Sequence, residues 1–454
     1  MFLNEDMIFI YSPSLSSRLE YVSEHLFKNI LKVDYILSDD KRAFLNYPGI
    51  CINYSPENLN HGIHILPHGL LEETGVRPYL NFDESRWDDL FCFFVNEGNP
   101  VLFDIFSASF YLLTSYEEYG TAKSDLHCRF PHEESMAYKN GFLNIPIVDR
   151  WTYKLKDLLI ETFGDTELYQ LRQYRFMSTF DIDYPYLYRN KGLLKNTVGI
   201  LRDLSKGEFT EITGRLKVLF HLEEDPYMRV LRWLDDFHKR YGKSYYLFSL
   251  ISGYGKYGRK TIYPQRKYYR YLRSLEEVEI GLHASYNSFL DKKKTDKEKR
   301  NLEKRLGKKI YVNRRHFLRI RLPETYRILD ELEFREDFSF AYAKFPGFRS
   351  GTAVPYFFYD LDRDIRTGLL IRPTIVMDSC LMTHQGLKPE DALLKLTQLA
   401  DECKKSGGDF VMLWHNNNLT GNQEKNPWVN VFIQSFEYAL SLENGNFGVG
   451  NKIK

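Results

Sequence analysis

The sequence predicts an α/β protein in which a smaller N-terminal α/β region precedes a larger region built on a parallel sheet or barrel. With 454 residues, the chain is longer than one ordinary hydrophobic core requires, so two domains are expected. Hydrophobic residues make up 43% and charged residues 27%, as in folded globular proteins. From about residue 174 onward, short apolar runs alternate with helical segments, which is the pattern of parallel α/β folds.

Residues 1–170 are predicted to form the smaller α/β domain, an accessory module. An apolar run of strand-like residues near the start is followed by a helical stretch, two further apolar runs and a long amphipathic segment. In order, these predicted elements are a strand at 7–11, a helix at 15–31, strands at 33–37 and 49–54, and a helix at 100–119.

Residues 171–454 are predicted to form the larger domain. Its helices have readable ends: Asp225 and Asn426 each precede a proline, which combines a capping side chain with a first-turn proline. The helix from Pro389 to about Lys405 stops before a pair of glycines. The very basic stretch 291–309 is interpreted as a solvated helix. The predicted strands are 174–180, 245–251, 278–282, 309–313, 370–377 and 410–414.

Charge and cysteine content limit the expected binding partners and cellular compartment of the protein. The net charge of +1 gives the chain as a whole no attraction to nucleic acid or to an anionic membrane, so neither is expected as a general partner. No segment has the apolar length of a membrane span, and residues 1–11 lack the basic end and long apolar stretch of a secretory signal. Five widely spread cysteines without a CxxC pair indicate reduced thiols, so a cytoplasmic location is expected.

Polar residues repeatedly follow the apolar runs of the second region. Functional groups of parallel α/β proteins collect at the carboxyl ends of the strands, so these residues are the candidates for chemistry. Asp181 and Asp183 are the sharpest signal, because one carboxylate can bind a metal ion while the other accepts a proton from water. The alternative is a pair of aspartates that cap a turn at the strand end. The complete set is Asp181, Asp183, His283, His316, Asp378 and His415.

The histidines and one glycine-bounded loop are weak signals when each is taken alone. A single histidine after an apolar strand is more often structural than a ligand. In the loop 347–351, glycines allow the backbone to turn tightly around Arg349. The order of these motifs along the chain is much less easily explained by chance than any one of them.

This ordered set, from Tyr174 to His415, resembles the polysaccharide deacetylase superfamily, carbohydrate esterase family 4. It is most similar to the Bacteroidetes-type members that carry an extra N-terminal domain, and the segments 103–118 and 145–151 resemble that partner domain. The motifs that carry the resemblance are TFDID (179–183), GLHASY (281–286), RRHFLR (314–319), GFRSGT (347–352), VMDSCL (376–381) and LWHN (413–416).

The resemblance implies a distorted (β/α) barrel and a divalent metal ion, with zinc expected. It implies that Asp181 is the general base, that Asp183 is a metal ligand and that His283 is the first metal-binding histidine. One departure concerns the second histidine, which in the family lies four residues after the first. That place is Asn287 here, and an amide oxygen is a weaker ligand for zinc than an imidazole. His316, at the next strand end, is the preferred replacement.

For the remaining site residues, the resemblance implies that His415 is the general acid and that Asp378 orients it. Arg349 is implied to steady the base carboxylate.

The leading functional hypothesis is a metal-dependent hydrolase that removes acetyl groups from an acetylated amino sugar or a polysaccharide precursor, with a carbohydrate as its substrate. The alternative is a saccharide-binding or scaffold protein in surface polysaccharide synthesis that keeps the fold and has lost catalysis. Asn287 favours the alternative, whereas the presence of Asp181, Asp183 and His415 together favours the enzyme.

Overall fold

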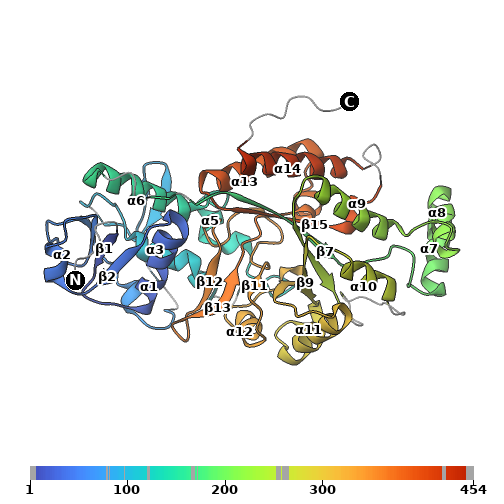
Figure 1. The fold of residues 1–454 in the computed structure, drawn as a ribbon, viewed down its shortest axis with the longest axis horizontal. Coiled ribbons are helices and arrows are strands. Elements are labelled where there is room, and N and C mark those ends of the chain that lie inside the picture. The colour runs from blue at the N-terminus through green and yellow to red at the C-terminus, as the bar shows by residue number, and fades with distance from the viewer. Residues whose placement is uncertain are drawn as a thin grey trace.

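The computed structural model describes residues 7–445, apart from 78, 79, 81, 97, 120–122, 165–168, 171, 252–256, 258–264 and 422–425. Two larger sheets organise the described residues: a four-stranded parallel sheet near the N-terminus and a nine-stranded, mainly parallel sheet in the rest of the chain. Figure 1 shows the first sheet among the blue elements at one end of the molecule. The α/β class predicted from the sequence is confirmed.

The N-terminal sheet has the strand order β2-β1-β3-β4, and all its neighbours are parallel. The predicted helix at 15–31 exists as α1 followed directly by the π-helix η1, and Ser16 caps its first turn by accepting a hydrogen bond from the backbone of Leu19. The bounds of this part are β1 (Ile8–Tyr11), α1 (Ser17–Ser23), η1 (Glu24–Leu31), β2 (Tyr35–Ser38), α2 (Lys41–Leu45), β3 (Cys51–Tyr54), β4 (Ile63–Ile65), β5 (Glu84–Trp87), β6 (Leu90–Phe93), α3 (Ile105–Leu113), α4 (Tyr116–Tyr119), α5 (Met136–Lys139) and α6 (Ile147–Phe163).

The helix predicted at 100–119 is shorter than expected and is broken in two. Phe103 pairs with Val95 in an isolated bridge, and Asp104 then caps α3 through a hydrogen bond from the backbone of Ser107. Ser115, with a φ of 52°, separates α3 from α4. The apolar periodicity was therefore correct for 105–113 but could not reveal the tertiary pairing that holds residue 103 in an extended bridge.

The nine-stranded sheet has the order β12-β13-β11-β10-β9-β8-β7-β15-β14, and only the β12–β13 pair is antiparallel. Its end strands, β12 and β14, are not paired with each other, so among the described residues no closed barrel is found. The bounds are β7 (Arg175–Ile182), β8 (Tyr245–Leu250), β9 (Val278–Ala284), β10 (Val312–Arg315), β11 (Glu336–Asp337), β12 (Tyr356–Asp360), β13 (Ile365–Ile371), β14 (Val376–Met377) and β15 (Asp409–His415).

The apolar run 370–377 contributes to two strands rather than one. β13 ends at Ile371, and the backbone of Arg372 then donates to Asp337 of the neighbouring β11. The chain turns away before β14, which pairs with β15 on the far side of the sheet. Hydrophobicity alone does not show this crossing, because both pieces are buried.

Helices flank the large sheet, and several of their ends are those predicted from the sequence. Asp225 and Asn426 cap helices that begin with proline, and the helix after residue 388 ends at Lys405. The basic stretch forms α11, most of whose residues are exposed or half-buried. The bounds are α7 (Leu193–Ser205), α8 (Phe209–Leu219), α9 (Pro226–Arg240), α10 (Arg266–Arg273), α11 (Lys292–Leu306), α12 (Glu324–Glu331), α13 (Pro389–Lys405) and α14 (Pro427–Asn444).

One continuous hydrophobic core extends from the N-terminal sheet into the large sheet. Polar contacts also join the two parts: the hydroxyl of Tyr21 donates to the carbonyl of Phe357 at 2.7 Å, and Arg18 pairs with Asp364 at 2.6 Å. The division predicted after residue 170 falls beside residue 171, which lies outside the described residues, and it stays a prediction. Within the described ranges, no helix is long and apolar enough to cross a bilayer.

Candidate metal centre and active site

Two pairs of neighbouring parallel strands, β7 with β15 and β9 with β10, lie on either side of β8 and bring the candidate residues to one edge of the large sheet. Asp181 lies at the end of β7, where it is in register with His415 of β15. His283 lies near the end of β9, and Arg314 of β10 is its register partner. Because the carboxyl ends of parallel strands meet at the same edge, side chains far apart in the sequence meet there.

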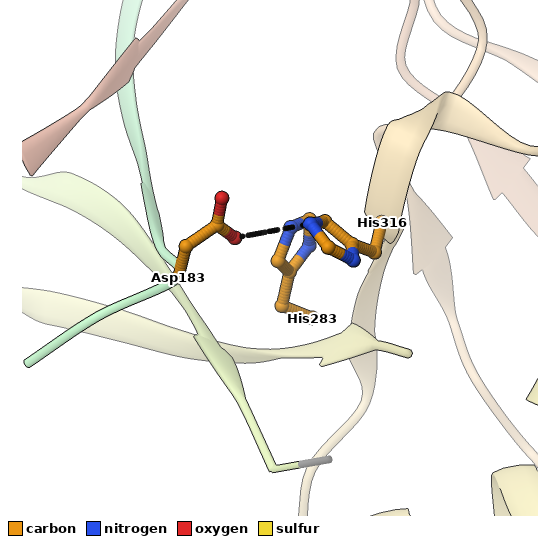
Figure 2. A group of neighbouring side chains, drawn as sticks. All are labelled: Asp183, His283 and His316. Atoms are coloured by element: carbon orange, nitrogen blue, oxygen red, sulfur yellow. Dashed lines mark ion pairs between the residues drawn. The ribbon is translucent and has the colours of Figure 1, made fainter. Parts of the chain in front are cut away.

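Asp183, His283 and His316 form a cluster whose ligand atoms all lie within 4.8 Å of one another. Asp183 Oδ1 is 3.3 Å from His283 Nε2 and 3.5 Å from His316 Nε2. Figure 2 shows the carboxylate facing both imidazole rings. The three residues predicted as metal ligands are therefore brought together, and they provide two nitrogens and one carboxylate oxygen.

The hydrogen bonds around His283 show that the cluster fits a cation. Its Nδ1 lies 3.0 Å from the carbonyl oxygen of Arg314, which can only accept, so Nδ1 carries the proton and Nε2 presents a lone pair. Nε2 of His283 and Oδ1 of Asp183 are both buried and have no hydrogen-bond partner among the described residues. Two facing acceptors without a donor are compensated by a positive charge between them, and a histidine held at its other nitrogen by a carbonyl is typical of metal ligands.

The charge of Asp183 agrees with this arrangement. Burial raises the pKa of its carboxyl, but in the metal-free protein the facing imidazoles of His316 and His283, when they are protonated, outweigh burial and hold the pKa well below its usual range. A cation bound between these groups would act on the carboxyl in the same direction. The ligand set of two imidazoles and one carboxylate, with further positions open, is a common one for catalytic zinc and for other divalent ions. Asn287 is exposed in the turn after β9 and does not line the cavity described below.

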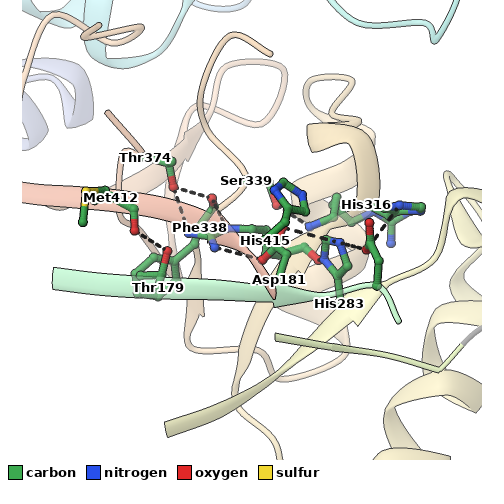
Figure 3. A network of polar contacts seen from close by, with 12 residues as sticks. Thr179, Asp181, His283, His316, Phe338, Ser339, Thr374, Met412 and His415 are labelled. Atoms are coloured by element: carbon green, nitrogen blue, oxygen red, sulfur yellow. Dashed lines mark hydrogen bonds and ion pairs between the residues drawn. The ribbon is translucent and has the colours of Figure 1, made fainter. Parts of the chain in front are cut away.

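Asp181 lies next to the cluster and is held by an arginine that sequence reasoning missed. Its Oδ1 accepts a hydrogen bond from Nη1 of Arg314 at 3.0 Å, and its Oδ2 lies 3.5 Å from Nε2 of His283. The guanidinium of Arg314 also donates to Thr374 and to the carbonyl of Phe338, so its orientation is fixed. Figure 3 labels Asp181, Thr374 and Phe338, the three residues that accept these hydrogen bonds. Burial lowers the pKa of Arg314, and Asp181 opposes that effect.

Arg349 was expected to steady Asp181. This expectation is wrong, because the guanidinium of Arg349 binds other groups. Its Nε and Nη2 donate to the two carboxylate oxygens of Glu118 at 2.9 and 2.7 Å, and its Nη1 donates to the carbonyl of Ala341. Glu118, from α4 in the N-terminal part, forms a bidentate pair that occupies the guanidinium. The signal that could have suggested Arg314 is its place within β10, two residues before His316.

His415 and Asp378 form the second polar unit of the site. Nδ1 of His415 lies 2.7 Å from Asp378 Oδ1, and Asp378 Oδ2 accepts hydrogen bonds from the backbone of His415 and from Asn418. Burial lowers the pKa of His415, but the charge and hydrogen bond of Asp378, with the charges of Asp183 and Asp181, raise it to about 10. The ring is thus a cation at neutral pH, oriented at Nδ1 and with Nε2 as its remaining donor.

A cavity of about 220 Å³ joins these groups into one site. Arg129 reaches it from the N-terminal part, anchored by its hydrogen bonds to Asp125 and to the carbonyl of Phe317. Neither Arg129, in a loop, nor His384, at the end of the short π-helix Cys380–His384, was predicted, because both lie outside the motifs that carry the sequence signal. The lining residues are Arg129, Asp181, Asp183, His283, His316, Phe317, Leu318, Ala343, Met377, Ser379, His384 and His415.

Comparisons with known proteins add little beyond the geometry. Residues 8–164 match the model of a family of unknown function, DUF7033. No curated protein matches the chain. A crystal structure described as a "putative polysaccharide deacetylase from Mycobacterium smegmatis" has a TM-score of 0.39 and 13% identity, and the likeness covers 59% of this chain and 83% of that chain. These values are too low for an inference about fold or activity. The N-terminal third is thus similar to a family without an assigned function.

Proposed function

We propose that this protein is a metal-dependent hydrolase of the polysaccharide deacetylase type, which removes acetyl groups from an acetylated amino sugar or a polysaccharide precursor. The observation that carries the proposal is the convergence, in one cavity, of the cluster Asp183, His283 and His316 with Asp181 and with His415, whose ring is bound by Asp378 behind it. In this proposal, the open sheet corresponds to the distorted barrel of that class, and residues 1–170 form an accessory domain.

Asp183, His283 and His316 would hold a divalent cation, with zinc proposed for the nitrogen-rich ligand set. When bound there, such an ion supplies Lewis-acid polarisation of a carbonyl oxygen and lowers the pKa of water. The carbonyl of Arg314 keeps the His283 ring in the orientation and tautomer that this role requires.

The chain's own residues supply the proton transfers of amide hydrolysis. Arg314 binds one oxygen of Asp181 and leaves the other on the side of the cluster, where it can accept a proton from the attacking water. His415 is protonated at neutral pH and can donate a proton to the departing amine. Asp378 holds the ring in place and stabilises its charge, as a third group does in other acid–base units.

Compartment and substrate carrier belong to the same proposal. The five cysteines form no disulfide in the structure, which supports a reducing, cytoplasmic setting. In such a setting, a nucleotide-linked or lipid-linked sugar is a more accessible substrate than a finished cell-wall polymer.

Metal content and acetate release test the proposal together. Wild-type protein that has been supplied with zinc is expected to retain the metal through gel filtration and to release acetate from N-acetylated amino-sugar oligosaccharides and nucleotide sugars. His316→Ala is expected to lose the metal, because one of three protein ligands is removed. Asp181→Asn is expected to retain the metal but to lose about 10²-fold or more of the acetate release, since it lacks the general base.

Two results would contradict this scheme. Equal metal content in wild type and His316→Ala would remove His316 from the ligand set. Stoichiometric metal binding without acetate release from any N- or O-acetylated sugar would instead favour a saccharide-binding protein that has lost catalysis. Asn287→Ala is the matched control: it changes the residue at the family's usual ligand position and should leave the metal content unchanged.

A further inference from the structure

A helical hairpin formed by α7 and α8 leaves the sheet directly after β7, the strand that carries Asp181. Figure 1 shows it at the end of the molecule opposite the N-terminal sheet, projecting from the body. Its base is firmly held: the buried carboxylate of Asp225, at the start of α9, accepts hydrogen bonds from the backbone of Leu187, Tyr188 and Arg189. These hydrogen bonds fix the base of the hairpin on the body of the protein.

The inward face of this hairpin is polar. Asp203 of α7 and Arg215 of α8 form an ion pair at 2.6 Å, in which the side chains are 1% and 8% exposed. Asn196 is buried beside them and accepts from the same guanidinium, which also lies 4.5 Å from the centroid of the Tyr188 ring. The close packing of the two helices also needs a glycine at position 199, since a Cβ there would lie 2.6 Å from Arg215. The two helices thus meet through charged and polar groups.

The outward faces are apolar, which reverses the usual order of a soluble helix pair. Nine of the seventeen exposed large hydrophobic side chains in the described part of the chain lie between residues 193 and 222. They recur at helical spacing, so each helix presents a stripe to the solvent. They are Leu193 (88% exposed), Leu194 (79%), Val198 (58%), Leu201 (60%), Leu204 (52%), Phe209 (64%), Leu216 (37%), Phe220 (72%) and Leu222 (74%).

The same segment is positively charged. Residues 193–222, which carry the nine apolar side chains, contain five basic and three acidic residues, a net charge of +2, whereas the whole chain has a net charge of +1. Asp203 and Arg215 neutralise each other in their buried ion pair, so four basic and two acidic residues of this segment remain to set the charge at the surface. Lys195 and Lys206 are exposed beside the apolar stripes, and Lys217 is exposed and pairs with Glu223 at 2.9 Å. Apolar and cationic groups thus share the outer surface.

We propose that this hairpin docks on the surface of an anionic phospholipid bilayer. The outward leucine and phenylalanine side chains would enter the boundary between headgroups and acyl chains, and the lysines would contact the anionic headgroups. Helix α7 has 13 residues and is therefore about 20 Å long. That is shorter than the roughly 30 Å of the hydrocarbon core, so the helix lies along the surface and does not cross it.

Charge favours a bilayer over a second copy of the chain as the occupant of this surface. Two copies that met through their hairpins would bring two segments of net charge +2 together, which is unfavourable. An anionic membrane offers acyl chains to the apolar stripes and negatively charged headgroups to the lysines. Exposed apolar surface of this extent on a soluble protein marks an interaction site.

Flotation with lipid vesicles tests the proposal on the full-length protein. Wild type is expected to float with vesicles of equal parts phosphatidylglycerol and phosphatidylcholine, and not with pure phosphatidylcholine. The double variant Val198→Gln/Leu201→Gln removes two exposed side chains from one stripe, and its partitioning is expected to fall roughly tenfold or more. Leu394→Gln is the matched control, since Leu394 is 58% exposed on α13, and it should float like wild type.

A charge-reversed variant provides an independent check. Lys195→Glu/Lys206→Glu should keep the wild-type thermal unfolding curve and lose flotation with the anionic vesicles. The proposal is overturned if wild type does not float, if either double variant floats like wild type, or if binding to neutral vesicles is equally strong. Concentration-dependent dimers that disappear in Val198→Gln/Leu201→Gln, together with no flotation, would overturn it in favour of self-association.

Discussion

At the scale of single residues, the site depends on which atom of each side chain is already engaged. His283 is held at Nδ1 by a carbonyl, so it offers Nε2 to the cluster. His415 is held at Nδ1 by a carboxylate, so it is a cation. The same residue type thus has two roles that are set by its hydrogen-bond partner, which the sequence motif around each histidine does not reveal.

The charge of His415 predicts a pH-dependent contribution to stability. Its pKa is about 10 in the folded protein and about 6.5 when the chain is unfolded. The folded state therefore binds the proton more tightly, and the stabilisation is complete below pH about 6.5 and is lost as the pH rises toward about 10. In metal-free protein, the difference in unfolding free energy between wild type and His415→Gln should shrink by a few kcal/mol over that range.

Urea denaturation at several pH values measures this difference. His384→Gln is the control, because burial, Arg129 and Lys344 lower the pKa of His384, so its pH dependence falls below about 6.5 instead. A difference for His415→Gln that stays constant from pH about 6.5 to about 10 would show that the His415–Asp378 pair does not hold the extra proton.

At the scale of elements, strand β9 shows how closely the site is packed onto the sheet. Gly281 lies two residues before His283, and a Cβ there would lie 2.6 Å from the ring of Phe248 and 3.0 Å from the carbonyl of Val312. Phe248 is itself fully buried, and the guanidinium of Arg314 lies 4.4 Å from its ring centroid. The ring cannot move without displacing the arginine that holds Asp181.

Gly281→Ala is therefore expected to lower the unfolding free energy by about 1–3 kcal/mol through overpacking. On the proposed function, Gly281→Ala should also reduce acetate release, since Arg314 would shift. Gly368→Ala is the matched control in β13, where the nearest atom to a Cβ is a carboxylate oxygen of Asp330 at 3.6 Å, an ordinary contact. Equal stability of the two variants in urea denaturation would show that β9 has room that the structure does not indicate.

The helices and strands also show which parts of the fold the sequence patterns predicted correctly. The runs that end at Asp181, His283 and His415 were predicted to within a few residues, because buried parallel strands are continuous apolar segments with polar ends. The pattern failed at 100–104 and at 372–375. At those places, pairing with Val95, a few residues earlier in the chain, and with Asp337, which is distant in sequence, decides the backbone path.

At the scale of the whole molecule, the N-terminal part contributes directly to the architecture around the site. Arg129 lines the cavity, and Glu118 forms a buried bidentate pair with Arg349 of the large-sheet part. The side chains of Glu118 and Arg349 are 6% and 2% exposed. Removing one charge of such a pair leaves the other buried and uncompensated, which is more costly than losing a surface pair.

Glu118→Gln is thus expected to lower the unfolding free energy by about 3–5 kcal/mol. Glu331→Gln is the control, because its ion pair with Lys292 has side chains that are 43% and 50% exposed, and its effect should stay below about 1 kcal/mol. Urea denaturation of both variants measures the contrast. A loss for Glu118→Gln as small as that for Glu331→Gln would show that the two parts of the chain are not tied by this pair.

The sequence by itself determined the α/β class, the strands that carry the site and the identity of the three residues that cluster, Asp183, His283 and His316. These depend on local patterns: apolar runs with polar ends, and motifs whose order is visible along the chain. Only the tertiary structure decided that Arg314 rather than Arg349 holds Asp181, that the large sheet is open at β12 and β14, and that the α7–α8 hairpin turns its apolar faces outward. Each of these depends on contacts between residues distant in sequence or on the direction in which a helix faces, and hydrophobic periodicity specifies neither.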